Sequence, residues 1–123
     1  IVVLGGDGFC GWPTSLKLAS NGWEVLIIDN LSRRNIDNEL GASSIIPIAS
    51  TDERIEVANS LIGKVHFQNI DITKEYQALE KSISDFQPNC IVHFAEQRAA
   101  GQDRFKSRLA WTSCPCSTLP PVP

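Results

Sequence analysis

The sequence contains no methionine and only one tyrosine, and its first residue, Ile1, already lies in an apolar run. We therefore interpret the chain as a piece of a longer protein. The lack of a visible signal peptide then says nothing about the location of that protein. An excess of basic charge is also lacking, since the 123 residues carry a formal net charge of -3. Because wrapping a phosphate backbone needs a basic surface, we expect no nucleic-acid partner.

Long apolar segments are lacking too. No run approaches the ~20 residues that a membrane helix needs, and stretches such as Val25 to Ile28 have the length of a strand. We expect no membrane partner. The cysteines form no C-x-x-C pair and match no zinc spacing, which predicts free thiols of a reducing compartment and no metal site. They are Cys10, Cys90, Cys114 and Cys116.

The chain does contain the 42% hydrophobic and 20% charged residues of a packed globular domain. Apolar runs predict buried strands at residues 1–4, 23–29, 65–71 and 90–95. Helical spacing predicts helices at residues 12–20, 50–62 and 73–86, whereas residues 31–48 show no clear period. The alternation indicates the α/β class, with an incomplete Rossmann-like doubly wound parallel sheet of about four strands.

Local signals place several helix ends. Gly22 suits the left-handed conformation that follows a helix, and Ser50 with Glu53 forms a capping box. Thr73 is expected to cap the last helix. On that helix, Tyr76 begins an apolar stripe, so we expect it to pack rather than to act as a catalytic base.

Three glycines carry the clearest chemical signal. Gly5, Gly8 and Gly11 are spaced G-x-x-G-x-x-G between a predicted strand and a predicted helix. In such a turn one glycine permits the bend, the next lets a pyrophosphate approach the backbone, and the third allows close helix–strand packing. The phosphates then rest on the N–H groups at the positive end of the helix.

Asp29 ends the second predicted strand, eighteen residues after Gly11. A carboxylate there can accept hydrogen bonds from a ribose diol and would repel a 2′-phosphate, which favours NAD over NADP as cofactor. Arg33 and Arg34 follow closely and could instead accommodate a 2′-phosphate, or simply form a solvated pair. Asp71 and Ile72, after the third strand, lie where an adenine ring would sit, although Asp71 could equally cap the next helix.

Taken together, the glycine turn, Asp29-Asn30-Leu31, Asp71-Ile72 and His93-Phe94-Ala95 resemble the extended short-chain dehydrogenase/reductases, the NAD-dependent epimerases and dehydratases of nucleotide sugars. Gly5 to Trp12 and Glu96-Gln97-Arg98 narrow the resemblance to the branch that makes the sulfolipid head-group donor from UDP-glucose and sulfite. The resemblance implies a tightly held NAD and a homodimer. It also implies a bacterial cytoplasm, or a plastid stroma in a photosynthetic eukaryote.

The resemblance also implies residue roles. Residues expected to line the cofactor phosphates are Gly5, Asp7, Gly8, Phe9, Cys10 and Gly11. Residues expected on the adenosine ribose side are Asp29, Asn30, Leu31, Arg33 and Arg34. Asp71 and Ile72 would flank adenine, and Arg54 would reach the cofactor or substrate region. Gln97 and Arg98 would contact the UDP-sugar or sulfite, although an Arg98 surface salt bridge fits nearly as well.

The family's catalytic Tyr-x-x-x-Lys pair lies beyond the fourth strand, and Tyr76 here is followed four residues later by Glu80. We therefore expect no catalytic residue in this chain, and we expect His93 to fill the core. Residues 101–123 hold four prolines and two cysteines and resemble nothing in the family, which indicates a disordered or frame-shifted tail after a partial NAD-binding domain at residues 1–100. The alternatives are a fragment of another nucleotide-sugar epimerase or dehydratase, and a non-catalytic NAD-binding module.

Overall fold

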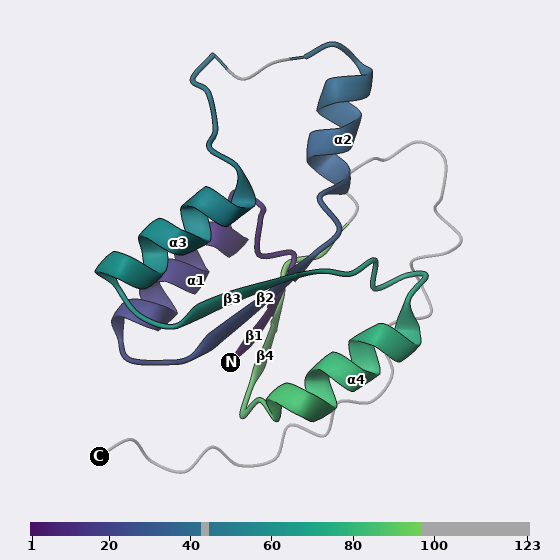
Figure 1. The fold of residues 1–123 in the computed structure, drawn as a ribbon. Coiled ribbons are helices and arrows are strands. Elements are labelled where there is room, and N and C mark those ends of the chain that lie inside the picture. The colour runs from purple at the N-terminus through teal and green to yellow at the C-terminus, as the bar shows by residue number, and fades with distance from the viewer. Residues whose placement is uncertain (43–44, 97–123) are drawn as a thin grey trace.

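The computed structural model describes residues 1–42 and 45–96, in which strands and helices alternate (Figure 1). The strands are β1 (Val2–Leu4), β2 (Val25–Asp29), β3 (Val65–Asn69) and β4 (Ile91–His93). The helices are α1 (Gly11–Ser20), α2 (Ser32–Glu39), α3 (Thr51–Leu61) and α4 (Tyr76–Phe86). Each predicted strand is present, although each is shorter than its apolar run.

All strand pairs are parallel, and the strand order is β3-β2-β1-β4. In β1, Val3 faces Ile27 of β2 on one side and Val92 of β4 on the other. The chain thus builds outward from β1 to β3, then crosses back to place β4 at the opposite edge. This order confirms the predicted Rossmann-like α/β class, and it brings the carboxyl ends of all four strands to one edge.

Helices cover both faces of the sheet: in Figure 1, α1 and α3 lie on one side and α4 on the other. Alternate residues of the central strands therefore enter two separate cores, which is why β1 and β2 are continuously apolar. The first core contains Val3, Ala19, Val25, Ile27, Ala58 and Val65. The second contains Val2, Leu4, Leu26, Ile28 and Ile70, against which Leu79 and Phe86 pack.

Two local predictions about helix ends are confirmed. Gly22 has φ +89°, the left-handed conformation expected after α1. The Ser50 hydroxyl accepts from the Glu53 N–H at 3.3 Å, and the Glu53 carboxylate accepts from the Ser50 N–H at 2.9 Å. The capping box therefore starts α3 where the sequence indicated.

Other expectations are wrong. Residues 31–48 were expected to lack a regular element, but α2 forms within them and buries none of its residues. Thr73 does not cap α4, which begins later with Glu75 as its N-cap. The Tyr76 side chain does not pack, since 69% of the residue is exposed. His93, expected in the core, is exposed at the end of β4.

Candidate functional site

The glycine turn after β1 is closed so tightly that the first and third glycines of its motif admit no side chain. Gly5 has φ +74°, and a Cβ there would lie 2.5 Å from the backbone nitrogen of Ala95. A Cβ on Gly11 would lie 2.2 Å from the carbonyl oxygen of Gly5. The first and third glycines therefore allow the bend and the contact between α1 and the strand ends, as the spacing predicts.

Gly8, the middle glycine, is less crowded than the other two. A Cβ there would meet one atom within 4 Å, the carbonyl oxygen of Gly5 at 3.3 Å. The next two residues, Phe9 and Cys10, are exposed, and α1 begins directly after them with no acidic residue in its first turn. The turn thus leaves backbone open beside the positive end of a helix, an arrangement that suits a phosphate.

Asp29 at the end of β2 ties this turn to the sheet. Its Oδ2 accepts from the backbone N–H of Asp7 at 3.0 Å, and its Oδ1 accepts from the backbone N–H of Leu31 at 2.8 Å. Leu31 has a left-handed φ of 54° and starts α2, while the Asn30 side chain accepts from the Ser32 N–H at 3.0 Å. Each carboxylate oxygen of Asp29 keeps a further lone pair for a ligand hydroxyl.

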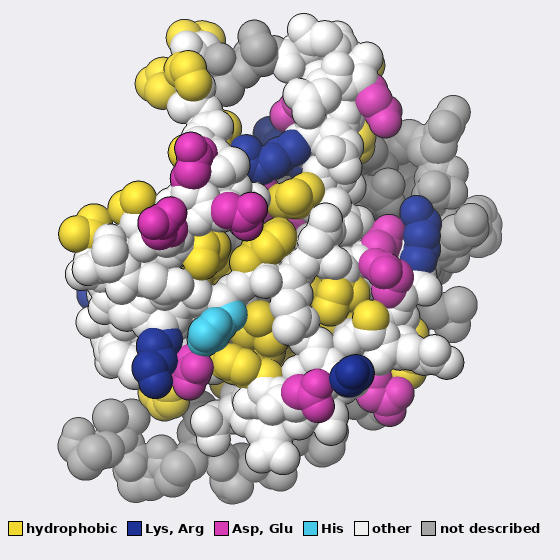
Figure 2. Space-filling model, viewed as in Figure 1, with side chains coloured by type: hydrophobic (Ala, Val, Ile, Leu, Met, Phe, Trp, Pro, Cys, Tyr) yellow, Lys and Arg dark blue, Asp and Glu magenta, His cyan; other side chains and the backbone are white. Residues whose placement is uncertain are grey.

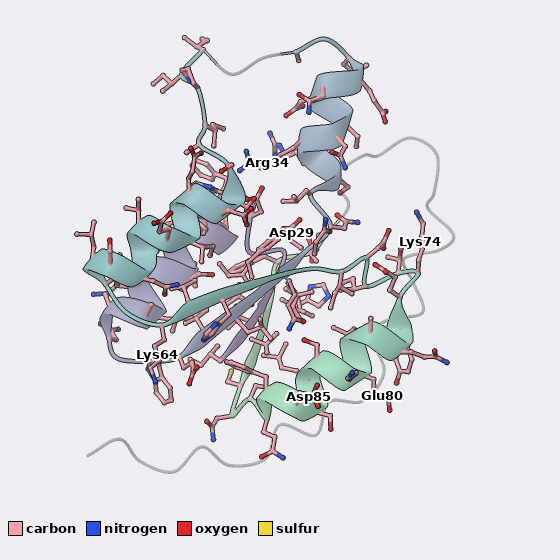
Figure 3. All side chains as sticks on the ribbon, viewed as in Figure 1. Asp29, Arg34, Lys64, Lys74, Glu80 and Asp85 are labelled. Atoms are coloured by element: carbon pink, nitrogen blue, oxygen red, sulfur yellow. The ribbon has the colours of Figure 1, made fainter. Side chains whose placement is uncertain are left out.

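Asp7 links the turn to two helices. Arg34 of α2 donates from Nε to Oδ2 of Asp7 at 2.5 Å and from Nη2 to Oδ1 at 3.0 Å. Arg54 of α3 donates from Nη2 to the same Oδ1. The Asp7 carboxylate raises the pKa of the Arg34 guanidinium through this hydrogen bond. Figure 3 shows Arg34 extending from α2 toward the end of β2, where Asp29 lies.

Arg54 is also held by an aromatic ring. Its guanidinium carbon lies 4.2 Å from the centroid of the Trp12 ring, a cation–π contact that fixes the side chain over the first turn of α1. The Arg54 Nε is buried and has no hydrogen-bond partner among residues 1–42 and 45–96. Figure 2 shows a group of basic side chains where α2 and α3 approach each other. A buried donor without a partner, beside an open glycine turn, fits an anionic ligand.

Asp71 stands at the same edge, after β3. Its Oδ1 accepts from the Thr73 hydroxyl at 2.6 Å and from the Thr73 N–H at 3.0 Å. The Thr73 hydroxyl is the main reason why the pKa of Asp71 is lowered from 3.8 to about 2, with Lys74 and Asn30 contributing as well. Ile72 is half-buried against the second core. Asp71 therefore stays ionised near the residues that follow β2.

The structure thus brings most of the predicted site residues to one edge of the sheet. Arg33 lies apart from the Asp7 cluster, exposed on α2, and Gln97 and Arg98 lie outside the described residues. The sequence did not identify Trp12 as a site residue, and it predicted no side-chain partner for Asp7. Trp12 follows Gly11 directly, so the glycine spacing was the signal that could have placed it at the turn.

Within residues 1–42 and 45–96, no three His, Cys, Asp or Glu side chains gather closely enough to hold a metal ion. No helix in that part of the chain has both the length and the apolar character to cross a bilayer.

The strand order, the glycine turn between β1 and α1, and an acid at the end of β2 define the nucleotide-binding half of a Rossmann-like domain. Comparison with known families agrees with this class: the NAD dependent epimerase/dehydratase family matches residues 1–113, across the change in composition near residue 100. The chain belongs to this family, which uses a nicotinamide dinucleotide.

The chain is also similar to individual members of the family. The chain is 39% identical over 113 residues to the chloroplastic UDP-sulfoquinovose synthase of Spinacia oleracea, a match covering 91% of this chain and 23% of the relative. It is 44% identical over 101 residues to the UDP-sulfoquinovose synthase of Sulfolobus acidocaldarius, covering 81% and 25%. A UDP-glucose 4-epimerase of Caenorhabditis elegans is 37% identical over 105 residues, covering 83% and 27%. The chain therefore spans about a quarter of the length of these relatives.

Proposed function

We propose that this chain is the NAD-binding part of an enzyme that makes UDP-sulfoquinovose from UDP-glucose and sulfite. The observation that carries the proposal is the glycine turn held against the end of β2 by the hydrogen bond from the Asp7 N–H to Asp29. Similarity to two UDP-sulfoquinovose synthases supports the choice of branch.

The residues of this chain would hold the dinucleotide along the carboxyl edge of the sheet. The phosphates would lie over Gly8 and the start of α1, where a Cβ is missing and the helix end is positive. Asp29 would accept from the ribose hydroxyls, and Asp71 with Ile72 would border the adenine. When bound, NAD supplies the removal and return of a hydride on the sugar.

We expect no turnover from this chain alone. Sugar oxidation needs a general base near the nicotinamide, and Tyr76 is exposed on α4, which packs against the opposite face from α1. Within the proposal, the base belongs to a part of the enzyme beyond this chain. Gln97 and Arg98, which come after β4 in the sequence, would contact the UDP-sugar or sulfite.

Calorimetric titration with NAD tests the cofactor site. The wild-type chain is expected to bind NAD, and Gly8→Val is expected to abolish binding because isopropyl carbons would lie where the phosphates must approach the turn. Gly63→Val is the matched control: a Cβ there would lie 3.2 Å from the Ala19 carbonyl oxygen, about as close as at Gly8, but Gly63 precedes β3 at the other end of the sheet, so binding should survive. Equal NAD affinity in the Gly8→Val and wild-type chains would disprove the assignment of the turn.

A second reaction has a specific observation in its favour, namely the 37% identity to a UDP-glucose 4-epimerase. The two reactions differ in their need for sulfite. The complete gene product should be incubated with NAD and UDP-glucose, with and without sulfite, and its products identified by mass spectrometry. UDP-sulfoquinovose formed only with sulfite supports our proposal, whereas UDP-galactose formed without sulfite supports the epimerase.

Assembly and compartment form part of the same proposal. We expect the enzyme to be a homodimer, which sedimentation of the complete gene product would test. We expect it to act in a bacterial cytoplasm, or in a plastid stroma if its source is a photosynthetic eukaryote. Fractionation of the source cells would test the compartment.

A further inference from the structure

Arg34 is the basic side chain best placed to meet a phosphate on the ribose, yet it is already engaged. It extends from α2 toward the end of β2, and the negative charge of Asp29 acts on it. Its Nε and Nη2 both donate to Asp7, so one edge of the guanidinium fork is used. An Arg recognises phosphate through two parallel N–H donors, the geometry that Asp7 now occupies.

We propose that Asp7 determines the preference for NAD over NADP by occupying Arg34. The inference rests on the proposed dinucleotide site and extends it to the choice between the two cofactors. Asp29 disfavours a 2′-phosphate by its charge. Asp7 adds a second barrier, because Arg34, on which the Asp29 charge acts and which could neutralise such a phosphate, is held by another anion.

The orientation of Asp7 is fixed from three sides. Its side chain is only 7% exposed, and its own N–H is bonded to Asp29. Arg54 donates to Oδ1, and the Trp12 ring holds Arg54 in turn. Because the Asp7 side chain cannot rotate away without losing these contacts, Arg34 stays hydrogen-bonded to Asp7 when a ligand approaches.

The charges near the ribose position balance as a result. Asp7 and Asp29 oppose Arg34 and Arg54, so the cluster is close to neutral. A 2′-phosphate would add between −1.5 and −2 charges near neutral pH, roughly as a phosphorylated side chain does. Removing the Asp7 charge leaves the cluster positive and frees the Arg34 fork at the same time.

The test measures the affinities of the whole chain for NAD and NADP by calorimetry, in wild type and in Asp7→Asn. Asparagine has nearly the same shape but lacks the charge that holds the guanidinium. We expect the ratio of the NADP to the NAD association constant to rise about 10-fold, the scale of a charge-assisted bond to phosphate. Asp85→Asn removes one exposed charge from α4, and it should leave the ratio unchanged.

Two double variants identify the arginine responsible. In Asp7→Asn/Arg34→Gln the rise in the NADP to NAD ratio should disappear, because the guanidinium that would bind the 2′-phosphate is removed. In Asp7→Asn/Arg33→Gln the gain should persist, because Arg33 is exposed and apart from Asp7. A gain that instead depends on Arg33 overturns the proposal.

The outcomes separate the two levels of inference. If wild type binds neither dinucleotide, the proposed function fails. If wild type binds NAD but Asp7→Asn leaves the ratio unchanged, this inference fails and the proposed function stands. Asp7→Ser provides a second, smaller replacement, and circular dichroism checks folding. If both Asp7 variants lose their helical signal, Asp7 is a structural residue and the proposal is overturned.

Discussion

The backbone N–H of Asp7 donates to Oδ2 of Asp29 across 3.0 Å, which fastens the turn after β1 to the end of the neighbouring strand. The second oxygen of the same carboxylate accepts from Leu31 at 2.8 Å. One side chain therefore sets both the position of the glycine turn and the start of α2.

Replacing Asp29 should loosen both segments together. In Asp29→Ala two backbone N–H groups lose their acceptor, and we expect a loss of about 1–3 kcal/mol in the free energy of unfolding. NAD affinity should fall as well, because the ribose loses its acceptor. Urea unfolding and calorimetry measure the two effects. Unchanged stability would show that water replaces the carboxylate at both N–H groups.

Gly11→Ala should damage the fold more than Gly8→Ala does. The new Cβ at residue 11 would overlap the Gly5 carbonyl at 2.2 Å, so backbone must shift, at a cost of about 1–3 kcal/mol. At residue 8 the nearest atom is 3.3 Å away, so the Gly5 carbonyl need shift by only a few tenths of an ångström and a smaller loss is expected. Thermal unfolding followed by circular dichroism compares the two variants, and similar midpoints would contradict the tight contact at Gly11.

Asn59 of α3 acts as a clamp on the first residue of β3. Its amide nitrogen donates to the Val65 carbonyl at 2.9 Å, and its Oδ1 accepts from the Val65 N–H at 2.7 Å. Asn59→Ala should lower the free energy of unfolding by about 1–3 kcal/mol, since two hydrogen bonds are lost. Ser60→Ala removes only a bond to the Val57 carbonyl of its own helix. If both variants lose equal stability in urea, the clamp is unimportant.

Asp71 should make stability depend on pH in the acid range. Its pKa in the folded chain is about 2, below the ordinary 3.8, chiefly because of the Thr73 hydroxyl. The ionised carboxylate therefore stabilises the fold above pH ~4, and that contribution is lost as the pH falls from about 4 toward 2. Asp71→Asn should flatten this part of the curve in urea unfolding at several pH values. Parallel curves for wild type and variant would contradict the assignment.

The sheet could be predicted because its signals are local. β1 and β2 are continuous apolar runs, which parallel strands covered on both faces require. The capping box likewise depends on two residues only three positions apart, Ser50 and Glu53. The glycine spacing predicted both the tight bend at Gly5 and the open backbone at Gly8.

What could not be predicted depends on residues far apart in the sequence. No apolar stripe marks α2, because the helix buries none of its residues, and its contact from Arg34 to Asp7 spans 27 positions. The contact from Arg54 to Asp7 spans 47 positions. Neither ion pair produces a periodic pattern in the sequence, so nothing in the sequence distinguishes Asp7 from the other polar residues of a turn.

The place of β1 between β2 and β4 has a consequence for synthesis on the ribosome. β2 follows β1 within one helix, but about 60 residues separate the end of β2 from the start of β4. At roughly 5–20 residues per second, the second hydrogen-bonding edge of β1 stays open for roughly 3–12 s on the nascent chain. During that interval the open edge of an apolar strand is available to chaperones and to other nascent chains.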